Sequence, residues 1–122
     1  MLNPTRLDVP PVRASVNFDW QWAGDPIPPQ FGFEVRTWLP GQVPLGVHDS
    51  VRDNQEGNIL SLGPDRYRLK VNDIRYAAGV QGREGVYNWT VLLVCVNPIY
   101  AETGRQANPA RFAYAPLSGS GR

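Results

Sequence analysis

The chain has one cysteine, one histidine, no long hydrophobic run and almost no net charge, and each shortage excludes a class of function. A single cysteine forms neither an internal disulfide framework nor a zinc site built on several thiolates. Twelve basic against eleven acidic residues give a formal charge of +1, so no strong field attracts nucleic acid or an anionic membrane. No stretch has the length needed to cross a bilayer. We therefore expect neither nucleic-acid binding nor direct membrane insertion.

Motifs that carry chemistry are also missing. No glycine-rich phosphate loop leads into a helix, no nucleophile elbow is present, and the polar run DNQEGN (53–58) does not match a calcium loop. His48 and Asp49 offer at most two metal ligands. Because no acid–base or nucleophilic constellation appears, we predict that the protein is not an enzyme and has no metal or cofactor.

Proline and glycine are abundant, with twelve residues of each placed between short apolar segments. This spacing favours many short strands joined by turns over long helices. The segment 43–51 is typical of a short edge strand, and 52–58 of a polar loop. Alternation of apolar and polar residues predicts further strands at 14–22, 31–39, 65–74, 85–98 and 109–115.

Strands at intervals of about ten residues, with no helical period between them, predict an all-β fold. We predict a two-sheet antiparallel β-sandwich of about seven strands, formed by residues 1–116, with 117–122 as a flexible tail.

The aromatic faces of two strands define the expected core. Trp22 ends the aromatic face of one strand, and Trp89 lies on the aromatic face of another together with Cys95. Facing sheets would bury all three side chains, so we expect Cys95 to be a buried and inert thiol.

Four segments carry a family resemblance: TRLDVPPV near the start, then FDWQW, FGFEVRTW and GVYNWTVLLV. In this order they resemble fibronectin type III and related immunoglobulin-like modules of modular bacterial surface or membrane-anchored proteins. The G-x-Y-x-W-x-V run from Gly85 is similar to versions in which the tyrosine, here Tyr87, starts the sixth strand at a corner. The 75–85 connection is longer than the tight corner of a typical fibronectin module. The resemblance implies a non-catalytic module of a larger extracellular or cell-surface protein, and an export signal would lie outside this sequence.

The outward face of the longest strand is unexpectedly apolar, because three aliphatic residues would meet water there. In the fibronectin topology that the resemblance implies, the strand of Trp38 is its neighbour and the last strand lies beside them, and Trp38 falls on the same outward face. We interpret this region as an interaction patch. Its candidate residues are Arg36, Trp38, Leu92, Val94, Val96 and Arg111. Two alternatives remain: the 41–63 segment or the 75–85 connection covers the patch, or the strand is buried on both sides.

These observations predict a spacer or protein-interaction module. Its partner would be another protein, neighbouring domains of the same chain or, weakly, a second copy. The alternative function is a carbohydrate-binding module, since an exposed tryptophan such as Trp38 stacks well on a sugar ring. The N-x-T sequon at Asn88 is a weak glycosylation signal because it falls within a predicted strand.

Overall fold

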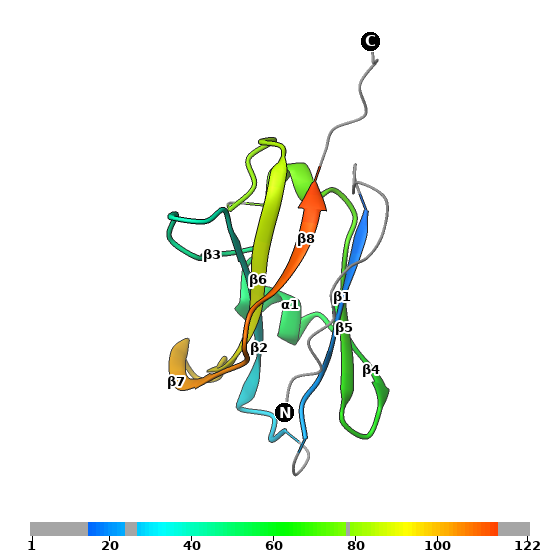
Figure 1. Cartoon of the computed structure of the whole chain (residues 1–122). Coiled ribbons are helices and arrows are strands. Elements are labelled where there is room, and N and C mark those ends of the chain that lie inside the picture. Colours follow the sequence, from blue (N-terminus) through cyan, green and yellow to red (C-terminus); the bar gives the residue numbers. More distant parts are fainter. Residues whose placement is uncertain (1–14, 24–26, 78, 115–122) are drawn as a thin grey trace.

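Two antiparallel sheets face each other in the computed structural model, which describes residues 15–23, 27–77 and 79–114 (Figure 1). One sheet has the order β1 (Val16–Gln21), β5 (Arg66–Val71), β4 (Ile59–Gly63). The other contains β3 (Leu45–Gly46), β2 (Phe31–Trp38) and β6 (Gly85–Cys95), and β6 also pairs with β7 (Ala101–Gln106) and β8 (Ala110–Tyr114). The predicted all-β, two-sheet sandwich is confirmed.

The strands expected from alternation occur close to their predicted bounds, and four elements were not expected. The smallest of the four is a 3-10 helix, η1 (Ile74–Tyr76), shortly after β5. β4 and β7 add two strands, so the described residues contain eight rather than about seven. A short helix, α1 (Ser50–Gln55), occupies most of the segment predicted to be a loop at 52–58. The expected first strand TRLDVPPV and the tail 117–122 lie outside the described residues.

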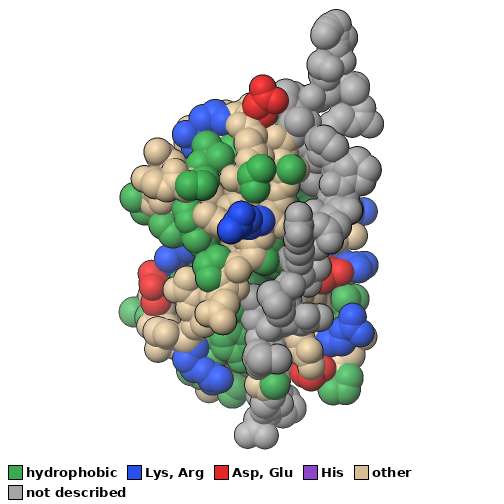
Figure 2. Space-filling view, viewed as in Figure 1, with side chains coloured by type: hydrophobic (Ala, Val, Ile, Leu, Met, Phe, Trp, Pro, Cys, Tyr) green, Lys and Arg blue, Asp and Glu red, His purple; other side chains and the backbone are tan. Residues whose placement is uncertain are grey.

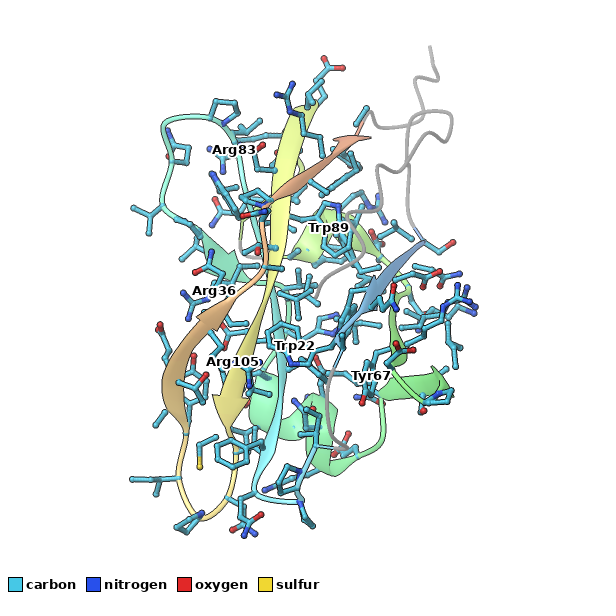
Figure 3. The ribbon with its side chains drawn as sticks, turned by 60° about the horizontal axis from the view of Figure 1, so that its bottom comes forward. Trp22, Arg36, Tyr67, Arg83, Trp89 and Arg105 are labelled. Atoms are coloured by element: carbon cyan, nitrogen blue, oxygen red, sulfur yellow. The ribbon has the colours of Figure 1, made fainter. Side chains whose placement is uncertain are left out.

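The core lies between the two sheets and is rich in aromatic rings. Phe18 of β1 packs against Trp89 of β6 with ring centroids 4.9 Å apart, and against Phe112 of β8 at 5.5 Å. Trp22 and Trp89 both lie between the sheets (Figure 3). Burial of residues this large supplies most of the favourable free energy of folding in a domain of this size.

The core between the sheets ends two residues before Cys95. The preceding residue on the same face, Leu93, is buried, whereas Cys95 is partly exposed at the end of β6, with its Sγ 3.4 Å from the carbonyl oxygen of Asn97. The expectation that Cys95 is buried was therefore wrong: its side chain lies at the last position of β6 and is partly exposed.

The long connection before β6 is tied to the fold by Tyr87. The Tyr87 hydroxyl lies 3.2 Å from the carbonyl oxygen of Val80 and also within hydrogen-bonding distance of the Arg83 carbonyl. Burial raises the pKa of this hydroxyl. Gly79 lies so close to β2 that an added Cβ would be 2.1 Å from the Thr37 carbonyl oxygen. The corner is thus closely packed despite its length.

The outer edge of β2 is covered by short segments from three places in the chain. The Phe31 N–H donates to the carbonyl of Pro28 at 3.0 Å, and the Val47 N–H donates to the carbonyl of Val35 at 2.9 Å. β3 pairs with Arg36 and Thr37 at the far end. Between these points the side chain of Asn54, from α1, bonds to the backbone of Phe33. A bare strand edge would invite pairing with another chain, and these contacts block it.

Helix α1 has a defined start and end although it has only six residues. The Asp49 side chain accepts from the Arg52 N–H at 3.2 Å, which is an N-cap. Gly57 has φ +75°, and the Asn58 N–H donates to the Asp53 carbonyl at 2.8 Å, closing the last turn. These caps fix where α1 sits against β2.

Candidate functional site

The register of β2 and β6 decides which side chains share the outward face of the five-stranded sheet. Trp38 lies opposite Asn88, and Arg36 lies opposite Thr90. Asn88 in turn pairs with Arg111 of β8. Trp38, Asn88 and Arg111 therefore form one row across three strands, as the sequence predicted for Trp38 and Arg111.

The aliphatic part of the predicted patch is not exposed. Leu92 and Val96 each retain 4% of their accessible surface and Val94 retains none. The three side chains form a second, smaller core with Val51 of α1. They must be removed from the candidate surface, because the 41–63 segment covers them, which is one of the alternatives left open above.

Helix α1 can approach this closely because β2 has a glycine at the contact. A Cβ added to Gly32 would lie 2.2 Å from the Oδ1 atom of Asn54. The Asn54 side chain occupies the space that this Cβ would take. It accepts from the Phe33 N–H at 3.0 Å and donates to the carbonyls of Phe33 at 2.8 Å and Ser50 at 2.7 Å. The amide thus joins helix to strand where a neighbouring strand would otherwise lie.

Arg36 is engaged by its neighbours and is not free for a partner. Its Nη2 atom donates to Glu102 at 2.9 Å and to the hydroxyl of Tyr100 at 3.1 Å, and its Nε atom pairs with Glu34. Glu34 also accepts from the Ser50 hydroxyl at 3.0 Å. Burial would lower the pKa of Arg36, but the bonds to Glu102 and Glu34 outweigh it and raise the pKa. This network fastens β7 and α1 to β2.

On the outward face of the five-stranded sheet, the end that holds Trp38 is accessible to solvent. Trp38 and Asn88 are half-buried and Arg111 is exposed. Val86, the next outward residue of β6, is 54% exposed. We call these four residues the Trp38 surface. In Figure 2 hydrophobic side chains gather near the upper end of β6 and β8, with basic side chains among them. Val86 and Asn88 were missing from the predicted patch, although the period of two along β6 places them in phase with Leu92.

The sequon at Asn88 is not presented as an acceptor site in the folded chain. Thr90, its third residue, is fully buried and its hydroxyl donates to the carbonyl of Ala107 at 2.7 Å. Glycosylation at Asn88 would require the strand to open.

The single histidine makes a structural contact near α1. His48 Nδ1 lies 3.1 Å from Asp53 Oδ2, and Asn58 donates to Asp53 Oδ1 at 2.9 Å. Burial would raise the pKa of Asp53, but these hydrogen bonds outweigh it and lower the pKa. The adjacent Asp49, considered with His48 as one of at most two metal ligands, caps α1. Within residues 15–23, 27–77 and 79–114, no three histidine, cysteine, aspartate or glutamate residues are grouped to hold a metal ion.

No family model matches the chain, and no curated protein matches it significantly. No helix in the described part of the chain is long and apolar enough to span a membrane. The fold and the geometry of its side chains are therefore the basis for a functional proposal.

Proposed function

We propose that the chain is a non-catalytic module of the fibronectin type III or immunoglobulin-like kind. It acts as a spacer or protein-interaction unit within a larger bacterial extracellular or cell-surface protein. The order of strands supports the family, since β1, β5 and β4 face β2, β6 and β8 as the two sheets of such modules do. The contact of the Tyr87 hydroxyl with the carbonyl of Val80 adds support, because it has the form of a tyrosine corner.

The Trp38 surface carries the proposed interaction. Tryptophan and arginine are residue types enriched at the centre of protein interfaces, and the exposed Val86 adds apolar area beside them. Among the described residues Arg111 forms no ion pair, so its charge is available to an acidic group on a partner. Because the surface is small, we expect weak binding to neighbouring domains of the same chain or to a second copy.

Replacing Trp38 by serine tests this proposal. Sedimentation equilibrium over a wide concentration range should show weak self-association that Trp38→Ser reduces several-fold, with an unchanged melting temperature. Tyr76→Ser is the matched control, because Tyr76 is 79% exposed and lies outside the Trp38 surface. A large loss of stability in Trp38→Ser would show that Trp38 belongs to the core, and unchanged association would move the interface elsewhere. Binding of a polysaccharide that Trp38→Ser abolishes would favour the carbohydrate-binding alternative at this surface.

A further inference from the structure

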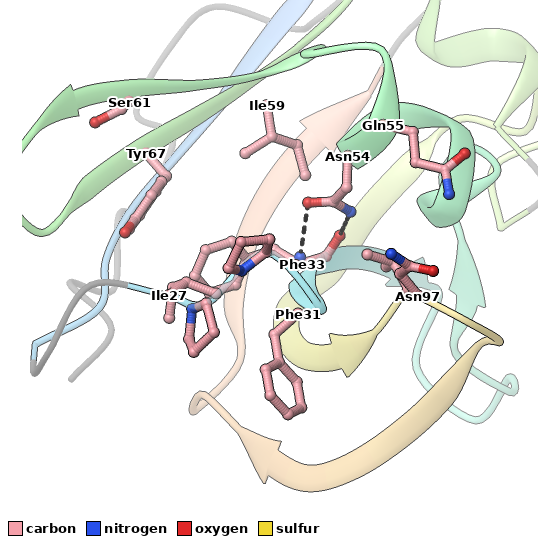
Figure 4. Close-up of a pocket in the computed structure, with 13 residues that line it drawn as sticks. Ile27, Phe31, Phe33, Asn54, Gln55, Ile59, Ser61, Tyr67 and Asn97 are labelled. Carbon is pink, nitrogen blue, oxygen red and sulfur yellow. Dashed lines mark hydrogen bonds between the residues drawn. The ribbon is translucent and has the colours of Figure 1, made fainter.

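A concave region lies between β2 and the β4–β5 pair, beside α1 and away from the Trp38 surface. It is a cleft of about 390 Å³, formed where the start of β2 diverges from β4 and β5 (Figure 4). This volume is at the small end of the range for ligand pockets in proteins. Its walls include Ile27, Pro28, Pro29, Phe31, Phe33 and Ile59.

The described lining of the cleft has no charged side chain, although the chain as a whole has 19% charged residues. Its polar side chains are amides and hydroxyls. Three of them, the hydroxyl of Tyr67 and the side-chain amides of Gln55 and Asn97, make no hydrogen bond within the described residues. The cleft therefore offers neutral groups that both donate and accept hydrogen bonds.

Three of the polar side chains lie at the two ends of the cleft. In Figure 4, Tyr67 lies at one end, while Gln55 and Asn97 lie at the other. Ile59 lies on one side between these ends, and Phe33 lies on the opposite side. A ligand that fits has apolar faces and hydrogen-bonding groups around its edge.

Contacts of Asn54 and Tyr67 hold two sides of the cleft in place. The Asn54 side chain uses its hydrogen bonds on the backbone of Phe33 and Ser50, which fixes α1 as one wall. The ring of Tyr67 packs between Trp20, with ring centroids 6.1 Å apart, and Phe33 at 4.7 Å. The Tyr67 hydroxyl is thus held in place, and a preorganised site loses less entropy on binding.

We propose that this cleft binds a neutral saccharide unit. A pyranose ring has two faces of C–H groups and a rim of hydroxyls that both donate and accept, which matches apolar walls with amide and hydroxyl groups at the ends. An anionic or cationic ligand would find no opposite charge in the described lining. A peptide has backbone groups on every side and fits the divided lining less well. This function is separate from the Trp38 surface and does not depend on it.

The test begins with the intact protein on an array of neutral and anionic glycans, followed by calorimetric titration with the best neutral oligosaccharide. Tyr67→Phe, Gln55→Ala and Asn97→Ala each remove one hydrogen-bonding group and should raise the Kd about 2- to 10-fold. Tyr76→Phe and Gln42→Ala are matched controls, because both residues are exposed and lie outside the cleft, and they should leave the Kd unchanged.

Trp38→Ser separates this proposal from the one above, since it should leave saccharide binding unchanged. The proposal is overturned if no neutral glycan binds at millimolar concentration, or if anionic glycans bind better than neutral ones. It is also overturned if the three cleft variants bind as the wild type does. A proline-rich peptide that shifts the NMR signals of Gln55 and Asn97 where oligosaccharides do not would assign the cleft to peptides instead.

Discussion

Replacing Gly32 by alanine should detach α1 from β2. The added methyl group would lie 2.2 Å from Asn54 Oδ1, far inside van der Waals contact, so the Asn54 side chain must move. Its movement breaks the three hydrogen bonds to the backbone of Phe33 and Ser50. Each is worth about 0.5–1.5 kcal/mol net, so we expect Gly32→Ala to lower the free energy of unfolding by about 2–4 kcal/mol.

Asn54→Ala provides a stricter test of this contact. It removes the side chain that the added methyl group would meet, together with the hydrogen bonds that this side chain makes. Alone it should cost about the same 2–4 kcal/mol. The double variant should then cost no more than Asn54→Ala, since the three atoms nearest to the added methyl group all belong to the Asn54 side chain. Alanine is also favoured over glycine in a strand by about 0.5–1 kcal/mol. The two effects are therefore strongly non-additive.

Urea unfolding of the wild type, both single variants and the double variant, followed by tryptophan fluorescence, measures this coupling. A Gly32→Ala protein as stable as the wild type would refute the close contact of α1 and β2. So would a double variant whose loss equals the sum of the two single losses.

Three further outcomes follow from the core, from Asp53 and from Cys95. Trp89→Ala should lower the free energy of unfolding by about 3–5 kcal/mol, and a wild-type melting temperature in this variant would contradict the register of β6. The hydrogen bonds that lower the pKa of Asp53 stabilise the fold above the ordinary aspartate pKa, so this stability should be lost as the pH falls below about 4. Denaturation across pH 2–7 should show a weaker acid dependence in Asp53→Asn than in the exposed control Glu84→Gln, and equal curves would contradict the assignment. Because Cys95 is partly exposed, Ellman's reagent should label the native protein, and labelling only in denaturant would show that the thiol is buried.

The strands that bury one face were predictable from the sequence. β1 alternates apolar and polar residues, and its apolar positions, such as Phe18, are buried, as is the inward set of β6 that includes Trp89. Alternation indicates which side of a strand is buried. For the same reason it correctly predicted that Trp38 lies on the outward face of β2.

The remaining elements leave no such signal. β7 is exposed along its whole length, so no residue is selected for burial. Helix α1 is too short to show a helical period, and only its caps, Asp49 and Gly57, mark it in the sequence. Whether Leu92 meets water depends on where α1 packs, which is a property of the tertiary structure. The cleft could not be predicted from the sequence either, because Tyr67 and Asn97 are distant in the chain and line the same cleft only after folding.

The edge of β2 determines how this protein would aggregate. Lifting α1 frees the backbone of Phe33 and, by the same movement, uncovers Leu92, Val94 and Val96. An unpaired strand beside an apolar stripe is a template on which other chains add strands. Aggregation should therefore start from a nearly native molecule with one detached helix, and its rate should follow the opening of six residues more closely than the global stability. In a protein with many such modules in a row, the crowding of neighbouring copies would make this short helix the element on which solubility depends.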